Sequence, residues 1–77
     1  MDNNIDNRIK NIMSVVFEIS IQEINDESSS DTIISWDSFR HMNLVIALEE
    51  EFNFQFSDDE VIQITNFKLI KKIIGSY

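Results

Sequence analysis

Ser38 is the residue of this chain whose type and position most favour chemistry, because it stands between Asp37 and Phe39 where a polar stretch gives way to an amphipathic segment. We expect its hydroxyl to be exposed at the start of a helix. The only histidine, His41, lies three residues along the same helix, and no Gly-x-Ser-x-Gly elbow surrounds the serine. These residues alone favour an ordinary helix-start serine over a catalytic one, and a partly buried structural histidine.

The composition excludes several kinds of site. The 77 residues include no cysteine and one histidine, which removes disulfides, thiolate metal sites and most imidazole metal sites. The acidic runs Glu49–Glu51 and Asp58–Glu60 lack the Asp-x-Asp-x-Asp-Gly pattern of a calcium loop, so no metal site is predicted. A chain this short buries only about 60% of the surface that its unfolded form exposes, so we predict that it is not an enzyme.

The charge is strongly negative and unevenly placed. The net charge is -8, and residues 18–60 hold 12 acids and one base, Arg40, while the remaining residues hold 2 acids and 5 bases. This charge disfavours nucleic acid and anionic membranes and predicts basic protein partners. No apolar run approaches the ~18 residues of a membrane span, and the first residues lack an export-signal pattern. We expect a monomer in the cytoplasm.

Apolar residues spaced by three and four predict a first helix over about residues 4–19. Residues 20–35 show neither a helical nor an alternating period, so a long loop is predicted. Loops longer than about 12 to 15 residues are uncommon in compact domains and are often functional. We expect its four isoleucines to pin it across the core; they are Ile21, Ile24, Ile33 and Ile34.

The remaining helices are predicted from their ends. Asp37 and Ser38 open a second helix that ends near Phe52, with Asn53 as the stop residue. A capping box over residues 57–60 predicts a short third helix. Thr65 or Asn66 caps a fourth helix that ends at Gly75. Together these elements predict an all-α fold: a small four-helix bundle, three helices longer and one short, that forms a single domain over residues 1–77, with a long loop between the first two helices.

The second helix has two apolar faces at about 100° per residue. One is the expected core stripe, which consists of Leu44, Val45, Leu48 and Phe52. The second arc consists of Phe39, Met42 and Ile46, with Glu49 and Glu50 beside it. Two hypotheses explain this arc: the bundle covers the helix on two sides, or the arc is a partner surface whose carboxylates steer basic proteins toward it.

The chain resembles acyl carrier proteins. Residues 34–39 read Ile-Ser-Trp-Asp-Ser-Phe, and residues 44–52 read Leu-Val-Ile-Ala-Leu-Glu-Glu-Glu-Phe. The family typically reads Leu-Gly-x-Asp-Ser-Leu, followed by a helix that ends in Leu-Glu-Glu-x-Phe. The resemblance continues through residues 57–60 and 64–67, which fall at the family's third helix and at the start of its fourth. It therefore covers nearly the whole chain.

The resemblance implies that Ser38 carries a covalent 4'-phosphopantetheine arm, with Asp37 as the recognition contact for a phosphopantetheinyl transferase and as the helix cap. The arm would hold acyl groups as thioesters for acyl-loading and acyl-transfer enzymes with basic docking surfaces. The pathways it implies are fatty-acid, polyketide or specialised lipid and sugar-acyl biosynthesis. The expected docking residues are Phe39, Arg40, Met42, Ile46, Glu49 and Glu50. A cargo cavity between helices is expected near Leu48, Phe54 and Ile64.

Departures from the family pattern bear on the pathway. Ser35 and Trp36 replace small residues, and Trp36 is expected to anchor the loop. Arg40 places a cation where fatty-acid carriers usually have an acid, which would reverse one docking contact. The Trp-Asp-Ser-x-x-His pattern looks more like carriers of specialised biosynthesis. Two alternatives are a D-alanyl carrier and, from another class, an unmodified acidic protein-interaction module.

Overall fold

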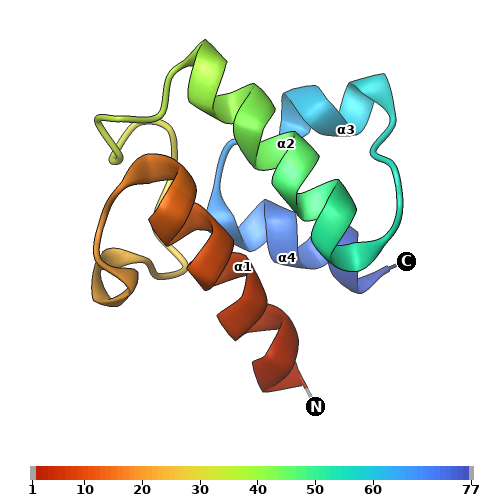
Figure 1. Ribbon diagram of the computed structural model, residues 1–77, viewed down its shortest axis with the longest axis horizontal. Coiled ribbons are helices and arrows are strands. Elements are labelled where there is room, and N and C mark those ends of the chain that lie inside the picture. The colour runs from red at the N-terminus through yellow and green to blue at the C-terminus, as the bar shows by residue number, and fades with distance from the viewer. Residues whose placement is uncertain (1, 77) are drawn as a thin grey trace.

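The computed structural model describes residues 2–76 of the chain, with side chains from Ile5 onward. Its α-helices are α1 (Asp2–Phe17), α2 (Ser38–Phe52), α3 (Asp58–Gln63) and α4 (Phe67–Gly75), and the 3-10 helix η1 (Ile21–Glu23) lies between α1 and α2. The predicted all-α fold is confirmed, including the short third helix and the long connection between the first two. Helix α2 lies centrally, with α1 on one side and α3 on the other (Figure 1).

The end of α1 differs from the prediction. The helix spans residues 2–17 instead of 4–19, because Glu18 adopts the left-handed conformation with φ of 56°. The N–H of Ile19 then bonds the carbonyl of Ser14 at 3.2 Å, and the Ser14 hydroxyl donates to the carbonyl of Ile19 at 2.6 Å. The first bond satisfies a carbonyl group that the helix end leaves free, and the second ties the residue after the turn back to the helix.

The other helix ends agree with local sequence signals. Asn53 closes α2 with φ of 58°, and the N–H of Phe54 bonds the carbonyl of Glu49 at 3.2 Å. Ser57 forms the predicted capping box at the start of α3. Of the two candidate caps for α4, Asn66 is the one used, since its side chain accepts from the Leu69 N–H at 2.7 Å.

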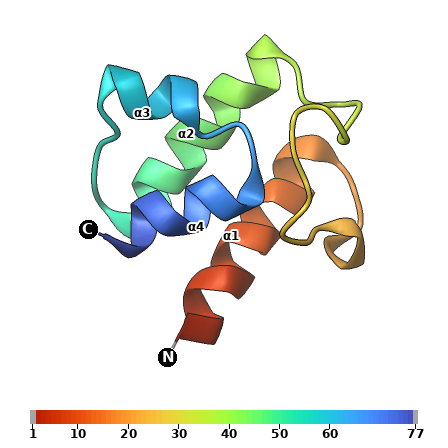
Figure 2. The ribbon, with the colours of Figure 1, turned by 180° about the vertical axis from the view of Figure 1, so that it is seen from behind.

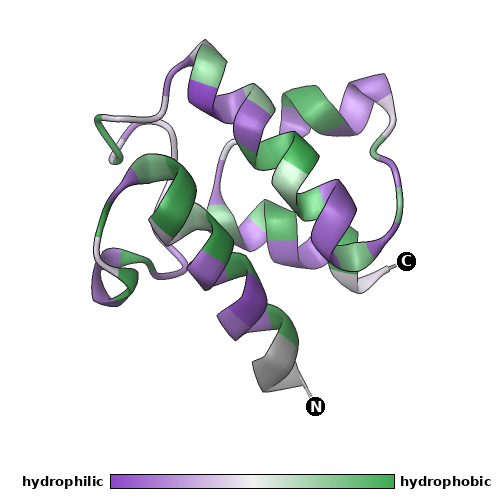
Figure 3. Cartoon of the chain, viewed as in Figure 1, coloured by the Kyte–Doolittle hydropathy of each residue, from purple (hydrophilic) through white to green (hydrophobic). Residues whose placement is uncertain are grey.

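The core lies between α1, α2 and α4, and the view from behind shows α4 beside α1 (Figure 2). Hydrophobic and hydrophilic residues alternate around the helices (Figure 3). The fully buried side chains come from these helices and from the connection before α4; the largest are Phe17, Phe67, Ile9, Met13, Leu44, Leu48, Ile64 and Ile70. None of the described helices has the length and apolar character to cross a membrane.

The connection between α1 and α2 is more ordered than predicted. It contains η1 and is joined to the start of α4 by two backbone bonds, from Phe67 N–H to Ser28 O and from Ser30 N–H to Thr65 O, both 2.9 Å. The expectation that all four isoleucines pin it is half wrong. Ile24 and Ile33 are buried, whereas Ile21 and Ile34 are exposed. Two anchors suffice because these backbone bonds also fix the segment.

Candidate functional site

Ser38 is the first residue of α2 and is exposed, as predicted. Asp37 caps the helix: its carboxylate accepts from the Arg40 N–H at 2.8 Å, and its carbonyl accepts from the His41 N–H at 2.8 Å. A capping carboxylate is favoured here by the exposed amides and the positive end of the helix dipole. Asp37 and Ser38 therefore form one local unit with the serine presented outward.

A groove of about 520 Å³ lies beside Ser38. Its lining includes two polar residues, Ser30 and Thr65, and two apolar residues, Met42 and Ile62. Trp36, Asp37 and His41 complete the lining. The groove thus lies where the loop, α2 and α3 meet.

Trp36 fixes the segment that precedes the serine. Its ring is 8% exposed and stacks on Phe17, with ring centroids 4.6 Å apart. The neighbouring Ser35 hydroxyl donates to the Phe17 carbonyl at 2.9 Å. The expected anchoring role of Trp36 is confirmed, and its partner is the last residue of α1.

His41 is held by hydrogen bonds at both ring nitrogens. The indole N–H of Trp36 donates to Nδ1 at 3.0 Å, and Nε2 lies 2.7 Å from the carbonyl oxygen of Val61. An indole nitrogen only donates and a carbonyl only accepts, so this network assigns the neutral tautomer with the proton on Nε2. His41 is therefore a structural histidine, as predicted, and both nitrogens are committed away from Ser38.

Arg40 points toward the end of α1. Its Nη1 donates to the Val16 carbonyl at 2.9 Å and lies 3.4 Å from the Glu18 carboxylate. The sequence identified Arg40 as a docking cation but gave no sign of this contact, which spans 24 positions in the chain. A guanidinium at the carbonyl end of a helix also interacts favourably with the helix dipole.

The second apolar arc of α2 is uncovered. Phe39, Met42 and Ile46 are 75%, 49% and 51% exposed, and Ile62 of α3 adds a side chain that is 73% exposed. The hypothesis that the bundle covers this arc is therefore wrong. Sequence reasoning missed Ile62 because a six-residue helix is too short to show which face is buried. We call the surface formed by these four residues the apolar arc.

The two acids beside this arc differ. Glu50 is exposed, whereas Glu49 accepts the Phe56 N–H on its carboxylate at 2.9 Å. Glu49 thus helps to hold the turn after α2 and leaves Glu50 as the freer charge. The described residues contain no cluster of three His, Cys, Asp or Glu side chains that could hold a metal ion.

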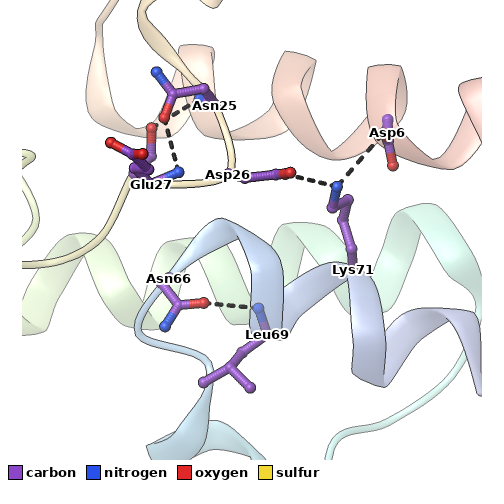
Figure 4. Close-up of polar contacts among 8 residues, drawn as sticks. Asp6, Asn25, Asp26, Glu27, Asn66, Leu69 and Lys71 are labelled. Carbon is purple, nitrogen blue, oxygen red and sulfur yellow. Dashed lines mark hydrogen bonds and ion pairs between the residues drawn. The ribbon is translucent and has the colours of Figure 1, made fainter.

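Basic side chains of α1 and α4 pair with the acidic middle of the chain. Arg8 bonds the Glu51 carboxylate at 2.7 Å. Lys71 bonds Asp26 at 2.7 Å and lies 3.6 Å from Asp6, so it joins α4 to both the loop and α1 (Figure 4). The hydrogen bond and charge of Lys71 lower the pKa of Asp26, and the hydrogen bond that Lys71 donates to Asp26 is the main cause that raises the pKa of Lys71.

The expected cargo cavity is not open in this structure. Leu48 and Ile64 are both 0% exposed and belong to the packed core, while Phe54 lies at its edge and contacts Phe56 edge to face at 4.6 Å. The groove beside Ser38 reaches the core at Trp36, but its lining includes neither Leu48 nor Ile64.

The fold and site define a small helical bundle that presents the exposed Ser38 at the start of α2, with the neighbouring histidine committed to structure. No model of a known protein family matches the chain. The acyl carrier protein of Buchnera aphidicola subsp. Baizongia pistaciae (strain Bp) is 34% identical over 74 residues, which cover 96% of this chain and 95% of that protein. The acyl carrier protein of Buchnera aphidicola subsp. Schizaphis graminum (strain Sg) is 34% identical over 58 residues, or 75% and 73% of the two chains.

The chain therefore belongs to the acyl carrier protein family. Its role is that of an acyl carrier, and it is not an enzyme.

Proposed function

We propose that Ser38 is the attachment point of 4'-phosphopantetheine and that the chain presents acyl groups on this arm to biosynthetic enzymes. The observation that carries the proposal is the exposed serine directly after the Asp37 cap, in a chain of this family. The bound group supplies a thiol on which acyl groups are held as thioesters, which accounts for a carrier whose sequence has no cysteine.

The residues around Ser38 fit this group. Ser38 is exposed and lines the groove beside the helix start, where the dipole favours a phosphate. In the attachment, the Ser38 oxygen bonds phosphorus and displaces the nucleotide part of coenzyme A, and the serine proton passes to a base. That base belongs to the phosphopantetheinyl transferase, because both nitrogens of His41 are engaged. Asp37 is the residue that the transferase recognises, and it keeps its capping role.

The docking surface of the proposed carrier is the apolar arc together with Arg40, Glu49 and Glu50. Exposed apolar side chains next to carboxylates suit acyl-loading and acyl-transfer enzymes with basic surfaces, since the charges steer approach and the apolar contacts hold the complex. Arg40 has a smaller effect on the binding of partner proteins than its charge suggests, because its guanidinium is bound to the end of α1. We further propose that the chain acts as a monomeric, single-domain protein of the cytoplasm.

The proposed pathways are fatty-acid, polyketide or specialised lipid and sugar-acyl biosynthesis, and the Trp-Asp-Ser-x-x-His pattern favours the specialised ones. A D-alanyl carrier is the nearest alternative. Loading assays with acyl and aminoacyl donors distinguish the two, since only a D-alanyl carrier is charged by an ATP-dependent D-alanine ligase.

The attachment is tested by incubating the purified chain with a promiscuous phosphopantetheinyl transferase and coenzyme A, followed by intact mass measurement. We expect one phosphopantetheine per chain and none on Ser38→Ala. Ser30→Ala is the matched control, because Ser30 lines the same groove and is also exposed, and it should be modified fully. No mass increase under conditions that modify a control carrier would favour the unmodified interaction module. An increase that persists in Ser38→Ala would place the attachment elsewhere.

A further inference from the structure

The hydroxyl of Ser38 bonds no other described residue, so the backbone on either side of it decides where its oxygen lies. Trp36 precedes the serine by two positions, and His41 follows it by three. The indole N–H of Trp36 donates to Nδ1 of His41 at 3.0 Å, and the two rings lie 25° from parallel. This hydrogen bond closes residues 36–41 into a ring that contains the serine.

The ring is anchored to two other parts of the fold. Trp36 is mostly buried and stacks on Phe17, the last residue of α1, with ring centroids 4.6 Å apart. On the other side, Nε2 of His41 donates to the Val61 carbonyl of α3 at 2.7 Å. His41 is therefore the side chain that joins the start of α2 both to α3 and to the buried Trp36.

These contacts are separate from those that form the helix start itself. Asp37 caps α2 by accepting the backbone N–H groups of Arg40 and His41, so the cap does not depend on the imidazole. Loss of the imidazole leaves the cap but releases the helix start from Trp36 and from α3. The indole N–H then lacks a partner, which is unfavourable in a mostly buried side chain. We expect Trp36 to shift toward water and to displace residues 37–38 with it.

We propose that His41 is a positioning residue for the attachment reaction: it holds the Ser38 oxygen where the transferase joins it to phosphorus. The inference rests on attachment of the arm to Ser38, as proposed above. In that step the Ser38 oxygen bonds the phosphorus of coenzyme A, the bond from this phosphorus to the nucleotide part breaks, and the serine proton passes to the base of the transferase. A small displacement of the attacking atom slows such a step strongly.

The location of His41 gives its loss a distinct kinetic effect. His41 is half-buried, whereas Phe39, Met42 and Ile46 form the exposed apolar side of α2. Replacement of His41 leaves these docking side chains in place, so it should lower the kcat of the transferase with little change in its KM for the carrier. Loss of a docking side chain weakens the complex and raises the KM instead.

Two variants separate the hydrogen bonds of His41 from the space that its ring fills. His41→Phe keeps an aromatic ring beside Trp36 but can neither accept nor donate a hydrogen bond. His41→Gln places one acceptor and one donor in a single amide group, as the neutral imidazole does. With a promiscuous phosphopantetheinyl transferase, saturating coenzyme A and varied carrier, we expect His41→Phe to lower kcat about tenfold and to keep the KM within about twofold of the wild type. His41→Gln should restore most of the lost kcat.

Two controls and one spectroscopic signal exclude a general loss of structure. Ile74→Val loosens the core from α4, no residue of which lines the groove beside Ser38, and Asn43→Ala removes an exposed side chain of α2. Both should keep the wild-type kcat and KM. Trp36 is the only tryptophan of the chain, so its fluorescence reports on the link without any transferase. Its emission should move to longer wavelength in His41→Phe and stay at the wild-type position in His41→Gln.

A wild-type kcat for His41→Phe, or an equal fall for Ile74→Val, would overturn the proposal, as would a His41→Gln value as low as that of His41→Phe. If circular dichroism shows that His41→Phe does not fold, Trp36→Phe provides the test, because it removes the same hydrogen bond and keeps a ring against Phe17. Its kcat should also fall, and an unchanged value would overturn the proposal. Absence of any arm on the wild type by intact mass would instead contradict attachment to Ser38, so failure of the two proposals can be told apart.

Discussion

The guanidinium of Arg40 donates a hydrogen bond to the backbone carbonyl of Val16 at 2.9 Å, and this bond joins the start of α2 to the last turn of α1. The final carbonyls of a helix lack partners within the helix, so a cation from another element satisfies one of them. Arg40 is the only base within residues 18–60. The guanidinium that a partner protein meets at this position is therefore already hydrogen-bonded within the carrier.

Replacement of Arg40 by alanine should lower the free energy of unfolding by about 1 to 2 kcal/mol, because a hydrogen bond from a charged donor is lost at a helix end. Urea unfolding followed by circular dichroism measures the change. Glu18→Gln is the control: its carboxylate is well exposed and lies 3.4 Å from Arg40, so its loss should cost less than about 0.5 kcal/mol. Equal stability of Arg40→Ala and the wild type would show that the Val16 contact is absent in solution.

Glu18→Gly should stabilise the fold by about 0.5 to 1 kcal/mol, since glycine adopts the left-handed conformation without the steric cost that a side chain imposes. Glu18 has φ of 56° at the end of α1. Asn53→Gly is an informative comparison, because Asn53 has φ of 58° but asparagine tolerates this region, so its gain should be smaller. Thermal unfolding of both variants shows which gains more stability. A melting temperature of Glu18→Gly below that of the wild type would contradict the prediction.

The ends of α1 and α2 show which parts of the fold could be predicted from the sequence and which could not. Asn53 and Ser57 act on their own helices through residues within a few positions, and their roles were predicted correctly. Glu18 is not a helix-stop residue by type, so the end of α1 was placed two residues late. Its left-handed conformation follows from how the loop returns across the core, which short-range patterns do not encode.

In the candidate site, too, some features could be predicted from local sequence patterns and others could not. The exposed Ser38, its Asp37 cap and the two faces of α2 follow from helical periodicity and capping. The bonds of His41 to Trp36 and Val61 depend on the placement of α3 against the loop. Long-range contacts of this kind need the tertiary arrangement and could not be predicted from residue types.

Met42→Ala and Ile46→Ala should each change stability by less than about 0.5 kcal/mol, because both side chains are about half exposed. If the apolar arc docks the phosphopantetheinyl transferase, each substitution should raise the KM of the transferase for this carrier severalfold, with little change in kcat. Val15→Ala is the matched control, since Val15 is 77% exposed on α1, whereas the arc belongs to α2 and α3; the KM of the transferase for this variant should equal that for the wild type. Unchanged KM values for both arc variants would remove the arc from the transferase interface.

Acid should weaken the link between the loop and α4 through Asp26. Lys71 lowers the pKa of Asp26 below its ordinary 3.8, so this carboxylate stabilises the fold above that pH and loses its effect as the pH falls through the lowered value. The pKa of Lys71 is raised above its ordinary 10.5, so its contribution to stability is complete below that pH and is lost as the pH rises through the raised value.

Asp26→Asn should therefore be less stable than the wild type at neutral pH, and the difference should vanish in acid. Asp31→Asn, in the same loop but without an ion pair among the described residues, controls for general charge repulsion. A stability difference for Asp26→Asn that stays constant down to the lowest pH would show that Asp26 does not act through its charge on Lys71.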